Sequence, residues 1–236
     1  MANSYFQFKQ FKIEQGSAAM KVSTDACIQG AWTAVQAADH DVLDIGCGTG
    51  LLSLMLAQKQ SEIQIDAVEL DADAALQASQ NVKHSPWSDR INVFQEDIKD
   101  FRPEKKYDLI ICNPPFFQNS LLGPDELRNQ ARHNHTLSYQ DLFDVIEKHL
   151  HPSGRASILL PSVEHTIWET IVQQNGWSVY HKLLVYPSVN KTFNRVVSII
   201  GSKQQETILE ALQIRDAENN YSETFTRLLG PYYLKL

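Results

Sequence analysis

The sequence contains few cysteines, no long apolar run and no excess of basic residues. Its three cysteines, Cys27, Cys47 and Cys112, are odd in number and show no CxxC spacing, which predicts small buried side chains and neither a disulfide nor a zinc site. No apolar stretch approaches the ~20 residues of a membrane span. Residues 1–9 lack the continuous apolar core of a signal peptide. We therefore expect a cytosolic protein without a membrane segment.

Basic charge is scarce in total, because 21 Lys and Arg face 28 Asp and Glu and leave a formal net charge of −7. This balance argues against non-specific binding of nucleic acid by the whole surface, but it does not exclude a local basic face. With 43% hydrophobic and 21% charged residues, the composition is that of a soluble globular protein. The 236 residues suit one α/β domain, and we expect it to be a monomer.

Apolar runs of strand length alternate with helical patterns along the chain. Strands are expected at 41–45, 63–70, 91–97, 107–112 and 154–160, and helices at 23–38, 49–60, 71–84, 138–150 and 163–175. Two further strands, 177–186 and 196–201, have no helix between them and should pair antiparallel. The pattern predicts an α/β fold with a mostly parallel sheet of seven strands, one of them antiparallel, and helices on both faces. The single domain, 1–236, divides into an N-terminal arm and helix (1–40), the sheet that would carry a site (41–203) and a C-terminal tail with a short helix (204–236).

The stretch from Val42 to Gly50 reads as a strand, a tight glycine turn and the start of a helix. Gly46 and Gly48 allow a positive φ and let a ligand lie against the backbone. Asp44, near the strand end, would repel a pyrophosphate but suits a cationic ligand. The alternative is an ordinary turn between a strand and a helix. The stretch resembles motif I of the class I methyltransferases, and the resemblance implies their fold and their cofactor S-adenosylmethionine, which carries a sulfonium and an ammonium group.

Acids stand at the ends of two further strands. Glu69 could accept hydrogen bonds from both ribose hydroxyls of a nucleoside, and Asp97 could accept from the exocyclic amine of an adenine while Ile98 offers a backbone N–H. Each acid has an ordinary alternative, which is a solvated strand end for Glu69 and a helix or turn cap for Asp97. Ligands of open α/β sheets bind outside the carboxyl ends of the strands. Gly46, Glu69, Asp97 and Asn113 should therefore converge.

The resemblance to class I methyltransferases also implies a set of cofactor contacts. The residues that it assigns to S-adenosylmethionine at the strand ends are Asp44, Gly46, Gly48, Glu69, Leu70, Asp97, Ile98 and Asn113. It further implies that the segment from Lys21 to Asp25, which includes Thr24, closes over the methionine end of the cofactor. Lys21 could equally be a plain surface lysine.

The most specific element is Asn113-Pro114-Pro115-Phe116, directly after the fourth strand. Each proline fixes its own φ and disfavours helix in the residue before it, so the side-chain carbonyl of Asn113 should stand beside the carbonyl of Pro114. Two such acceptors can take both hydrogens of one NH₂ group and localise its lone pair for attack on a methyl group. Phe116 offers a face for a base taken out of its stack. The motif resembles the (Asn/Asp/Ser)-Pro-Pro-(Tyr/Phe) motif of amino-methyltransferases and marks Asn113, Pro114 and Phe116 as catalytic; the alternative is a proline-rich turn with a core phenylalanine.

Two groups of basic residues could provide a local positive face for phosphates. The group that follows the catalytic motif comprises Arg128, Arg132, His133 and His135. The group on the final hairpin comprises His181, Lys182, Lys191 and Arg195. The alternative for both is solvated surface charge. The histidines 133 and 135 have no third ligand in the sequence, and we expect no metal.

Four segments of the sequence make the resemblance more specific than the methyltransferase class as a whole. They are residues 20–32, the Asn-Pro-Pro-Phe motif with residues 131–133, residues 194–197, and the ending over 221–235. In these segments the chain is similar to the bacterial tRNA (adenine-N6)-methyltransferases that modify valine tRNA next to the anticodon, although Gly230-Pro231 replaces an expected charged pair. The resemblance implies methylation of the exocyclic N6 amine of adenine 37, with tRNA as the partner.

Two other classes of function stay open. A ribosomal guanine-N2 methyltransferase or a protein glutamine-N5 methyltransferase would share the Asn-Pro-Pro motif, although a separate helical N-terminal domain or a duplicated domain is not evident here. A non-catalytic RNA-binding protein with a degenerate methyltransferase fold would not need the strand-end acids or Asn113. Both classes are therefore disfavoured.

Overall fold

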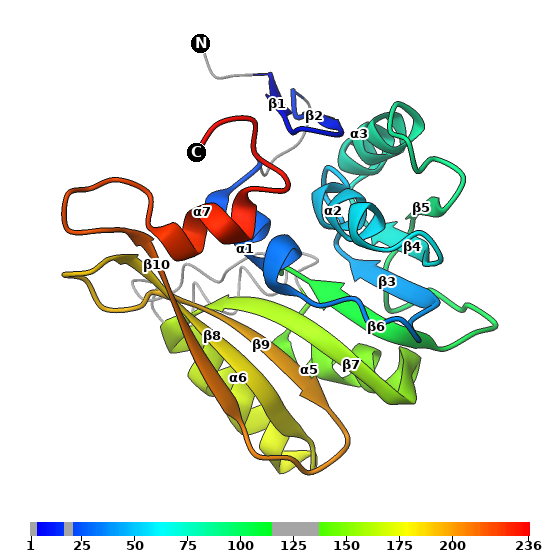
Figure 1. Ribbon diagram of the computed structural model, residues 1–236. Coiled ribbons are helices and arrows are strands. Elements are labelled where there is room, and N and C mark those ends of the chain that lie inside the picture. Colours follow the sequence, from blue (N-terminus) through cyan, green and yellow to red (C-terminus); the bar gives the residue numbers. More distant parts are fainter. Residues whose placement is uncertain (1–3, 17–20, 115–136) are drawn as a thin grey trace, which may run out of the picture.

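The computed structural model describes residues 4–16, 21–114 and 137–236. An eight-stranded sheet forms the centre of this part of the chain, in the order β10-β8-β9-β7-β6-β3-β4-β5 (Figure 1). Its strands are β3 (Asp41–Ile45), β4 (Gln64–Glu69), β5 (Ile91–Gln95), β6 (Tyr107–Cys112), β7 (Leu150–Pro161), β8 (Ser178–Ser188), β9 (Arg195–Gly201) and β10 (Ile208–Arg215). The helices are α1 (Thr24–Trp32), α2 (Leu51–Lys59), α3 (Ala72–Lys83), α5 (Tyr139–His149), α6 (Ser162–Gln174) and α7 (Glu223–Leu229). A separate hairpin pairs β1 (Tyr5–Gln7) with β2 (Lys12–Glu14).

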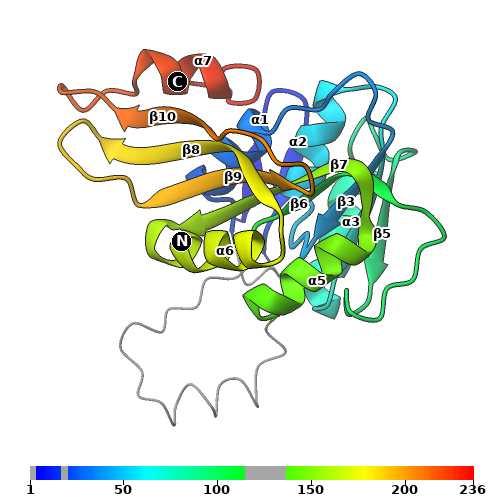
Figure 2. The ribbon, with the colours of Figure 1, turned by 90° about the horizontal axis from the view of Figure 1, so that it is seen from below.

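Helices cover both faces of the sheet. α1, α2, α3 and α7 lie on one face, and α5 and α6 lie on the other (Figures 1 and 2). The central strand β6 contributes to both cores, because Leu109 and Ile111 pack on the side of α2 while Ile110 and Cys112 pack on the side of α5. All four side chains are at most 2% exposed. A strand buried on both faces has the nearly continuous apolar sequence from which β6 was predicted.

The predicted fold class is confirmed. β9 runs antiparallel to both of its neighbours, and the other adjacent pairs of the sheet are parallel. The strand count is a correction, because Ile208–Arg215, expected as part of the tail, pairs with β8 and makes an eighth strand. Leu212 accounts for this pairing, since it is 4% exposed and packs into the core beside its register partner Val185. The sheet therefore extends beyond residue 203.

The end of α1 is a second correction. The helix ends at Trp32 and does not continue to Ala38 as expected. Lys59 explains the early end, because its Nζ donates to the carbonyl oxygens of Ala31 and Thr33 at 2.7 and 2.6 Å. Carbonyls at a helix end need partners from outside the helix, and this ammonium group provides them.

Polar side chains start the helices that flank the site. Asp71 Oδ1 accepts a hydrogen bond of 2.8 Å from the backbone N–H of Ala74 at the start of α3, as expected for a helix cap. Ser138 and Asp141 form a capping box at the start of α5. The longest of the described helices, α6, has 13 residues, and none of them has the length and apolar character to cross a membrane.

The N-terminal arm and the C-terminal segment pack together beside α2 (Figure 1). Phe8 of the arm is 0% exposed and forms an isolated antiparallel bridge with Tyr233. The backbone N–H of Lys9 donates to the carbonyl of Tyr232 at 2.8 Å. The hydroxyl of Tyr232 in turn donates to the carbonyl of Met55 in α2 at 3.2 Å. The two ends of the chain thus support the helix that follows the glycine turn.

Candidate active site

The predicted strand-end residues converge at one edge of the sheet. β3 has β4 on one side and β6 on the other, and Ile45 is in register with both Val68 and Cys112. The next residues, Gly46 and Asn113, therefore emerge side by side at the carboxyl ends of β3 and β6. This is the topological switch point of the sheet, at which open α/β sheets bind their ligands.

The glycine turn adopts the backbone geometry expected from the sequence. Gly46, Gly48 and Gly50 have φ values of 67°, 55° and 79°. A Cβ added to Gly46 or Gly48 would meet no atom within 4 Å, whereas one added to Gly50 would lie 3.6 Å from Ala78 Cβ. The first two glycines thus leave open space beside the turn, and the third allows α3 to pack closely.

Asp44 lies beneath this turn and has an incomplete set of partners. Its side chain is 0% exposed, and its Oδ2 accepts hydrogen bonds from Ser53 N at 3.1 Å and Ser53 Oγ at 2.6 Å. Its Oδ1 is buried and has no hydrogen-bond partner in the part of the chain that the structure describes. Burial raises the pKa of this carboxyl to about 7. A buried acceptor of this kind suits a cationic ligand, so the arrangement fits the role predicted for Asp44.

Glu69 has a structural role that the sequence did not reveal. Its Oε2 accepts from the backbone N–H of Gly48 at 2.8 Å, and its Oε1 accepts from that of Asp71 at 2.9 Å. The carboxylate thereby joins the glycine turn to the start of α3. Each oxygen keeps one further lone pair that could accept from a ribose hydroxyl, and that contact stays a prediction.

In the turn after β5, Asp97 acts as a turn cap, which was the alternative to its predicted contact with an adenine. Its Oδ1 accepts from the backbone N–H of Lys99 at 2.9 Å and so caps the turn. Ile98 is buried at 8% exposure, while Leu70, after β4, is 41% exposed. The predicted contacts of these three residues with an adenine stay predictions.

Asn113 is the second residue at this edge with an unused acceptor. Its Oδ1 is buried and has no hydrogen-bond partner among the described residues. Gln29 supports the strand end that carries it, because Gln29 Nε2 donates to the carbonyl of Cys112 at 3.0 Å and to that of Ser157 at 3.1 Å. The role of Gln29 was not predicted from the sequence, although a glutamine within the apolar stretch of α1 was an available signal. Pro114 is buried, and the predicted residues Pro115 and Phe116 lie outside the described residues.

The start of α1 is tied to the sheet near the predicted site. Asp25 Oδ2 accepts from Arg195 Nε at 2.9 Å, which joins the first turn of α1 to the start of β9. Lys21 and Thr24 are exposed. Asp25 was predicted to contact the cofactor and Arg195 to contact RNA. Their ion pair gives both residues a structural role, and the predicted contacts of this segment stay predictions.

Comparisons with known proteins identify the family. The model of the methyltransferase small domain matches residues 31–180. A protein of Dyadobacter fermentans named tRNA1(Val) (adenine(37)-N6)-methyltransferase is 41% identical over 99% of this chain and 98% of its own length. A protein of Tolumonas auensis with the same name is 40% identical over 100% of this chain and 99% of its own length. The chain belongs to the family of tRNA1(Val) (adenine(37)-N6)-methyltransferases.

Solved structures support the methyltransferase fold. The chain is similar to a predicted O-methyltransferase from Agrobacterium tumefaciens, with a TM-score of 0.65, 15% identity and coverage of 88% of this chain and 96% of that chain. It is also similar to TYW2 from P. horikoshii in complex with MeSAdo, with a TM-score of 0.60, 15% identity and coverage of 84% and 71%. At this level of identity the likeness concerns the fold alone.

The basic groups predicted for this tRNA methyltransferase family member are only partly described. Arg128, Arg132, His133 and His135 lie outside the described residues. On the final hairpin, Lys182 Nζ lies 2.7 Å from Glu169 Oε1 and His181 Nε2 lies 2.6 Å from Glu210 Oε1. Because Arg195 is also paired with a carboxylate, this group forms a weaker positive face than the sequence suggested. Lys191 is exposed.

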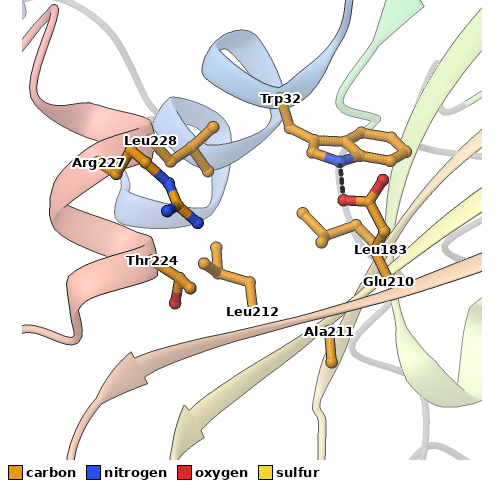
Figure 3. Close-up of a pocket in the computed structure, with 8 residues that line it drawn as sticks. All are labelled: Trp32, Leu183, Glu210, Ala211, Leu212, Thr224, Arg227 and Leu228. Atoms are coloured by element: carbon orange, nitrogen blue, oxygen red, sulfur yellow. Dashed lines mark hydrogen bonds between the residues drawn. The ribbon is translucent and has the colours of Figure 1, made fainter.

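The three cysteines are free and buried, as predicted, and the described ranges contain no group of three His, Cys, Asp or Glu side chains suited to a metal ion. A cavity of about 430 Å³ lies between α1, α7, β8 and β10 (Figure 3). Glu210, which lines this cavity, accepts a hydrogen bond from Trp32 Nε1 at 3.1 Å. Arg227 on α7 lies on the opposite wall of the cavity. None of the predicted site residues lines this cavity.

Proposed function

We propose that the protein is an S-adenosylmethionine-dependent methyltransferase that methylates the exocyclic N6 amine of adenine 37 in tRNA1(Val). The observation that carries the chemistry is the buried, unpartnered Oδ1 of Asn113 beside the glycine turn. Family membership supplies the substrate, because relatives about 40% identical over their full length bear this activity as their name. The tRNA substrate also supports our expectation of a cytosolic enzyme, and a monomer remains our expectation for its assembly.

The residues at the carboxyl ends of β3 and β4 fit the proposed cofactor. Asp44 Oδ1 is a buried acceptor that would be satisfied by a positively charged group of the cofactor. The open space beside Gly46 and Gly48 leaves room for a ligand against the backbone. Glu69 would accept from the ribose hydroxyls and Asp97 from the adenine amine. When bound, S-adenosylmethionine supplies a methyl group activated by its sulfonium centre. The protein's part is to bind and orient the two reactants.

Asn113 would act on the target amine. Its Oδ1, together with the carbonyl of Pro114, would accept both hydrogens of the adenine NH₂ group. Accepting both hydrogens favours tetrahedral geometry at nitrogen and localises the lone pair that is otherwise shared with the ring. The contact strengthens as positive charge develops on nitrogen, so it stabilises the transition state more than the ground state. Gln29 would keep this strand end in place through the carbonyl of Cys112.

One experiment separates the candidate substrates. The purified protein is incubated with labelled S-adenosylmethionine and, in parallel, total tRNA, total rRNA and a protein release factor. We expect label only in tRNA, and mass spectrometry of the digested tRNA should find N6-methyladenine in the anticodon loop of valine tRNA. Label confined to rRNA would support a guanine-N2 methyltransferase, and label confined to the release factor a glutamine methyltransferase. Either result would refute the proposed substrate.

A further inference from the structure

The hairpin of β8 and β9 differs in charge from the rest of the chain. The whole sequence has a formal net charge of −7, yet residues 170–205 contain no Asp or Glu. The same stretch contains four basic side chains of Lys and Arg, namely Lys182, Lys191, Arg195 and Lys203. The segment therefore contributes no carboxylate of its own that would repel the phosphates of a polyanionic partner, although Glu169 and Asp25 from other elements pair with Lys182 and Arg195.

The turn between these strands stands at the same edge of the sheet as Asn113. β6 is parallel to β7, and β9 is antiparallel to both β7 and β8, so β6 and β8 point in one direction. The turn is held in place at its base. Asn194 N donates to Val185 O, Ser162 N donates to Asn194 O, and Lys191 N donates to Ser188 O, each at 3.1 Å. The turn is thus an ordered projection that joins the two strands (Figure 2).

An aromatic pair flanks the turn without belonging to a core cluster. The rings of Tyr186 and Phe193 lie 5.7 Å apart at 65°, an edge-to-face contact, and both side chains are half-buried. Val189, in the turn itself, is 38% exposed, and Val163, next to Ser162 at the base of the turn, is 76% exposed. Apolar and aromatic surface of this kind is covered by planar or apolar groups more favourably than by phosphates alone.

Among the described residues, Lys191 is the basic side chain of the turn that forms no ion pair with a carboxylate. It is exposed and forms no ion pair of 4.0 Å or less with any residue in the described ranges. By contrast, Lys182 and Arg195 lie 2.7 and 2.9 Å from carboxylate oxygens. A planar aromatic face beside an unpaired ammonium group is the combination that binds single-stranded nucleic acid.

We infer that the β8–β9 turn is a contact surface for single-stranded RNA that flanks the target base. Phe193 and Tyr186 stack against a base, and Lys191 contacts a phosphate. Arg195 acts indirectly, since its ion pair with Asp25 holds the base of the turn against α1. The inference rests on the proposed function for the class of substrate, and it adds Tyr186 and Phe193 to the basic residues of the hairpin that were predicted from the sequence.

The test compares two lysines of the same hairpin. Lys191→Ala removes the proposed phosphate contact, while Lys203→Ala removes an exposed lysine just after β9, at the opposite end of the hairpin. Binding of an unmodified valine tRNA transcript is measured at several salt concentrations. We expect Lys191→Ala to weaken binding and to reduce the slope of log affinity against log salt by about 0.7–0.9. Lys203→Ala should behave like the parent.

The aromatic contact is tested by Phe193→Leu. This change removes a stacking face but no charge, so affinity should fall about 5-fold to 150-fold while the salt slope stays the same. Affinity for S-adenosylmethionine is measured in parallel and should not change. Parent-like tRNA binding by both Lys191→Ala and Phe193→Leu would overturn the inference, as would equal losses in Lys191→Ala and Lys203→Ala. A parent protein that binds tRNA through this turn but methylates only rRNA or a protein would refute the proposed function instead.

Discussion

Two buried aspartates on the neighbouring strands β3 and β4 differ in how many of their carboxylate oxygens have partners. Asp66, in β4, is 5% exposed, and each of its carboxylate oxygens has a partner. Its Oδ2 lies 2.8 Å from Tyr107 Oη and 2.9 Å from Lys105 Nζ, and its Oδ1 accepts from Asn92 Nδ2 at 3.2 Å. Asp44, in β3, is more deeply buried and leaves its Oδ1 without a partner.

We interpret this difference as one between an acid that stabilises the fold and an acid that would bind a ligand. A buried polar atom without a partner costs free energy, so such atoms are rare in a folded protein unless they have another use. Asp66 stabilises the fold through three side chains. The unpartnered atoms of Asp44 and Asn113 occur at the carboxyl ends of adjacent strands, where the sheet would bind its cofactor and its target base.

The largest effect is expected for Asn113→Ala, which removes the unpartnered acceptor without disturbing a hydrogen bond within the described residues. Loss of one preorganised polar group costs about 2.7–4 kcal/mol in the transition state, so methyl transfer should slow by about a hundredfold to a thousandfold. Affinity for S-adenosylmethionine should change little. Single-turnover methyl transfer at saturating tRNA and cofactor is the measurement.

A folded Asn113→Ala enzyme that transfers methyl at the parent rate would make Asn113 a structural turn residue. Gln29→Leu provides a second comparison, because it leaves the Asn113 side chain in place and removes the hydrogen bond to Cys112 at the end of β6, together with the one to Ser157 in β7. It should reduce turnover less than Asn113→Ala does.

Glu69→Ala is expected to have the next largest effect, on cofactor affinity. The change removes the acceptor of Gly48 N and the predicted acceptor of the ribose hydroxyls. Hydrogen bonds to a charged group contribute about 1.5–3 kcal/mol each, so affinity should fall tenfold or more in calorimetry. Asp71→Ala is the matched control. It removes the side-chain cap of α3 but keeps the backbone N–H of residue 71, which donates a hydrogen bond to Glu69. If Glu69→Ala binds no more weakly than Asp71→Ala, the assignment of Glu69 to the cofactor is wrong.

Asp66→Ala should act on stability alone. It leaves the buried hydroxyl of Tyr107 and the ammonium of Lys105 without their shared partner, and one unsatisfied buried group costs about 1–3 kcal/mol. The midpoint of urea unfolding should fall accordingly, while cofactor affinity at a temperature where the variant is folded should match the parent. A variant of unchanged stability that loses cofactor affinity would remove the distinction between the two aspartates.

The sequence predicted the parts of this fold and site that depend on short-range pattern. The apolar run of β6 and the glycine spacing after β3 were sufficient, because a strand buried on both faces and a turn with positive φ each restrict the residues that can occupy them. β10 was missed because most of its residues are exposed and Leu212 alone packs deeply. An edge strand of this kind lacks the apolar run by which a central strand is recognised.

Long-range hydrogen bonds could not be predicted in the same way. Nothing near Lys59 in the sequence indicates that its ammonium group ends α1, more than 20 residues earlier. Likewise, Gln29 and Cys112 are 83 residues apart, and their contact exists only once α1 packs on the sheet. The candidate site was therefore predicted at its strand ends, whereas the side chains that support those ends became apparent only in the fold.

The last predicted effect, which is small near neutral pH, is a dependence of cofactor affinity on pH that arises from Asp44. Burial raises its pKa from 3.8 in the unfolded chain to about 7 in the folded protein. The folded protein therefore holds a proton that the unfolded chain has lost between these values, so this group's contribution to stability is present below pH 3.8 and is lost as pH rises to about 7. A cationic ligand prefers the ionised carboxyl, so cofactor affinity should fall by up to about tenfold for each pH unit below 7.

Calorimetry of S-adenosylmethionine binding between about pH 5.5 and 8 measures this dependence. Asp44→Asn cannot ionise and should bind the cofactor weakly at every pH, with a flatter profile than the parent. The corresponding change Asp66→Asn is the control, because Asp66 already has partners for both oxygens and should leave the slope of the profile unchanged. An equal slope in the parent and in Asp44→Asn would show that the buried carboxyl of Asp44 does not meet the positive charge of the cofactor, and the contrast between the two aspartates would then be one of packing alone.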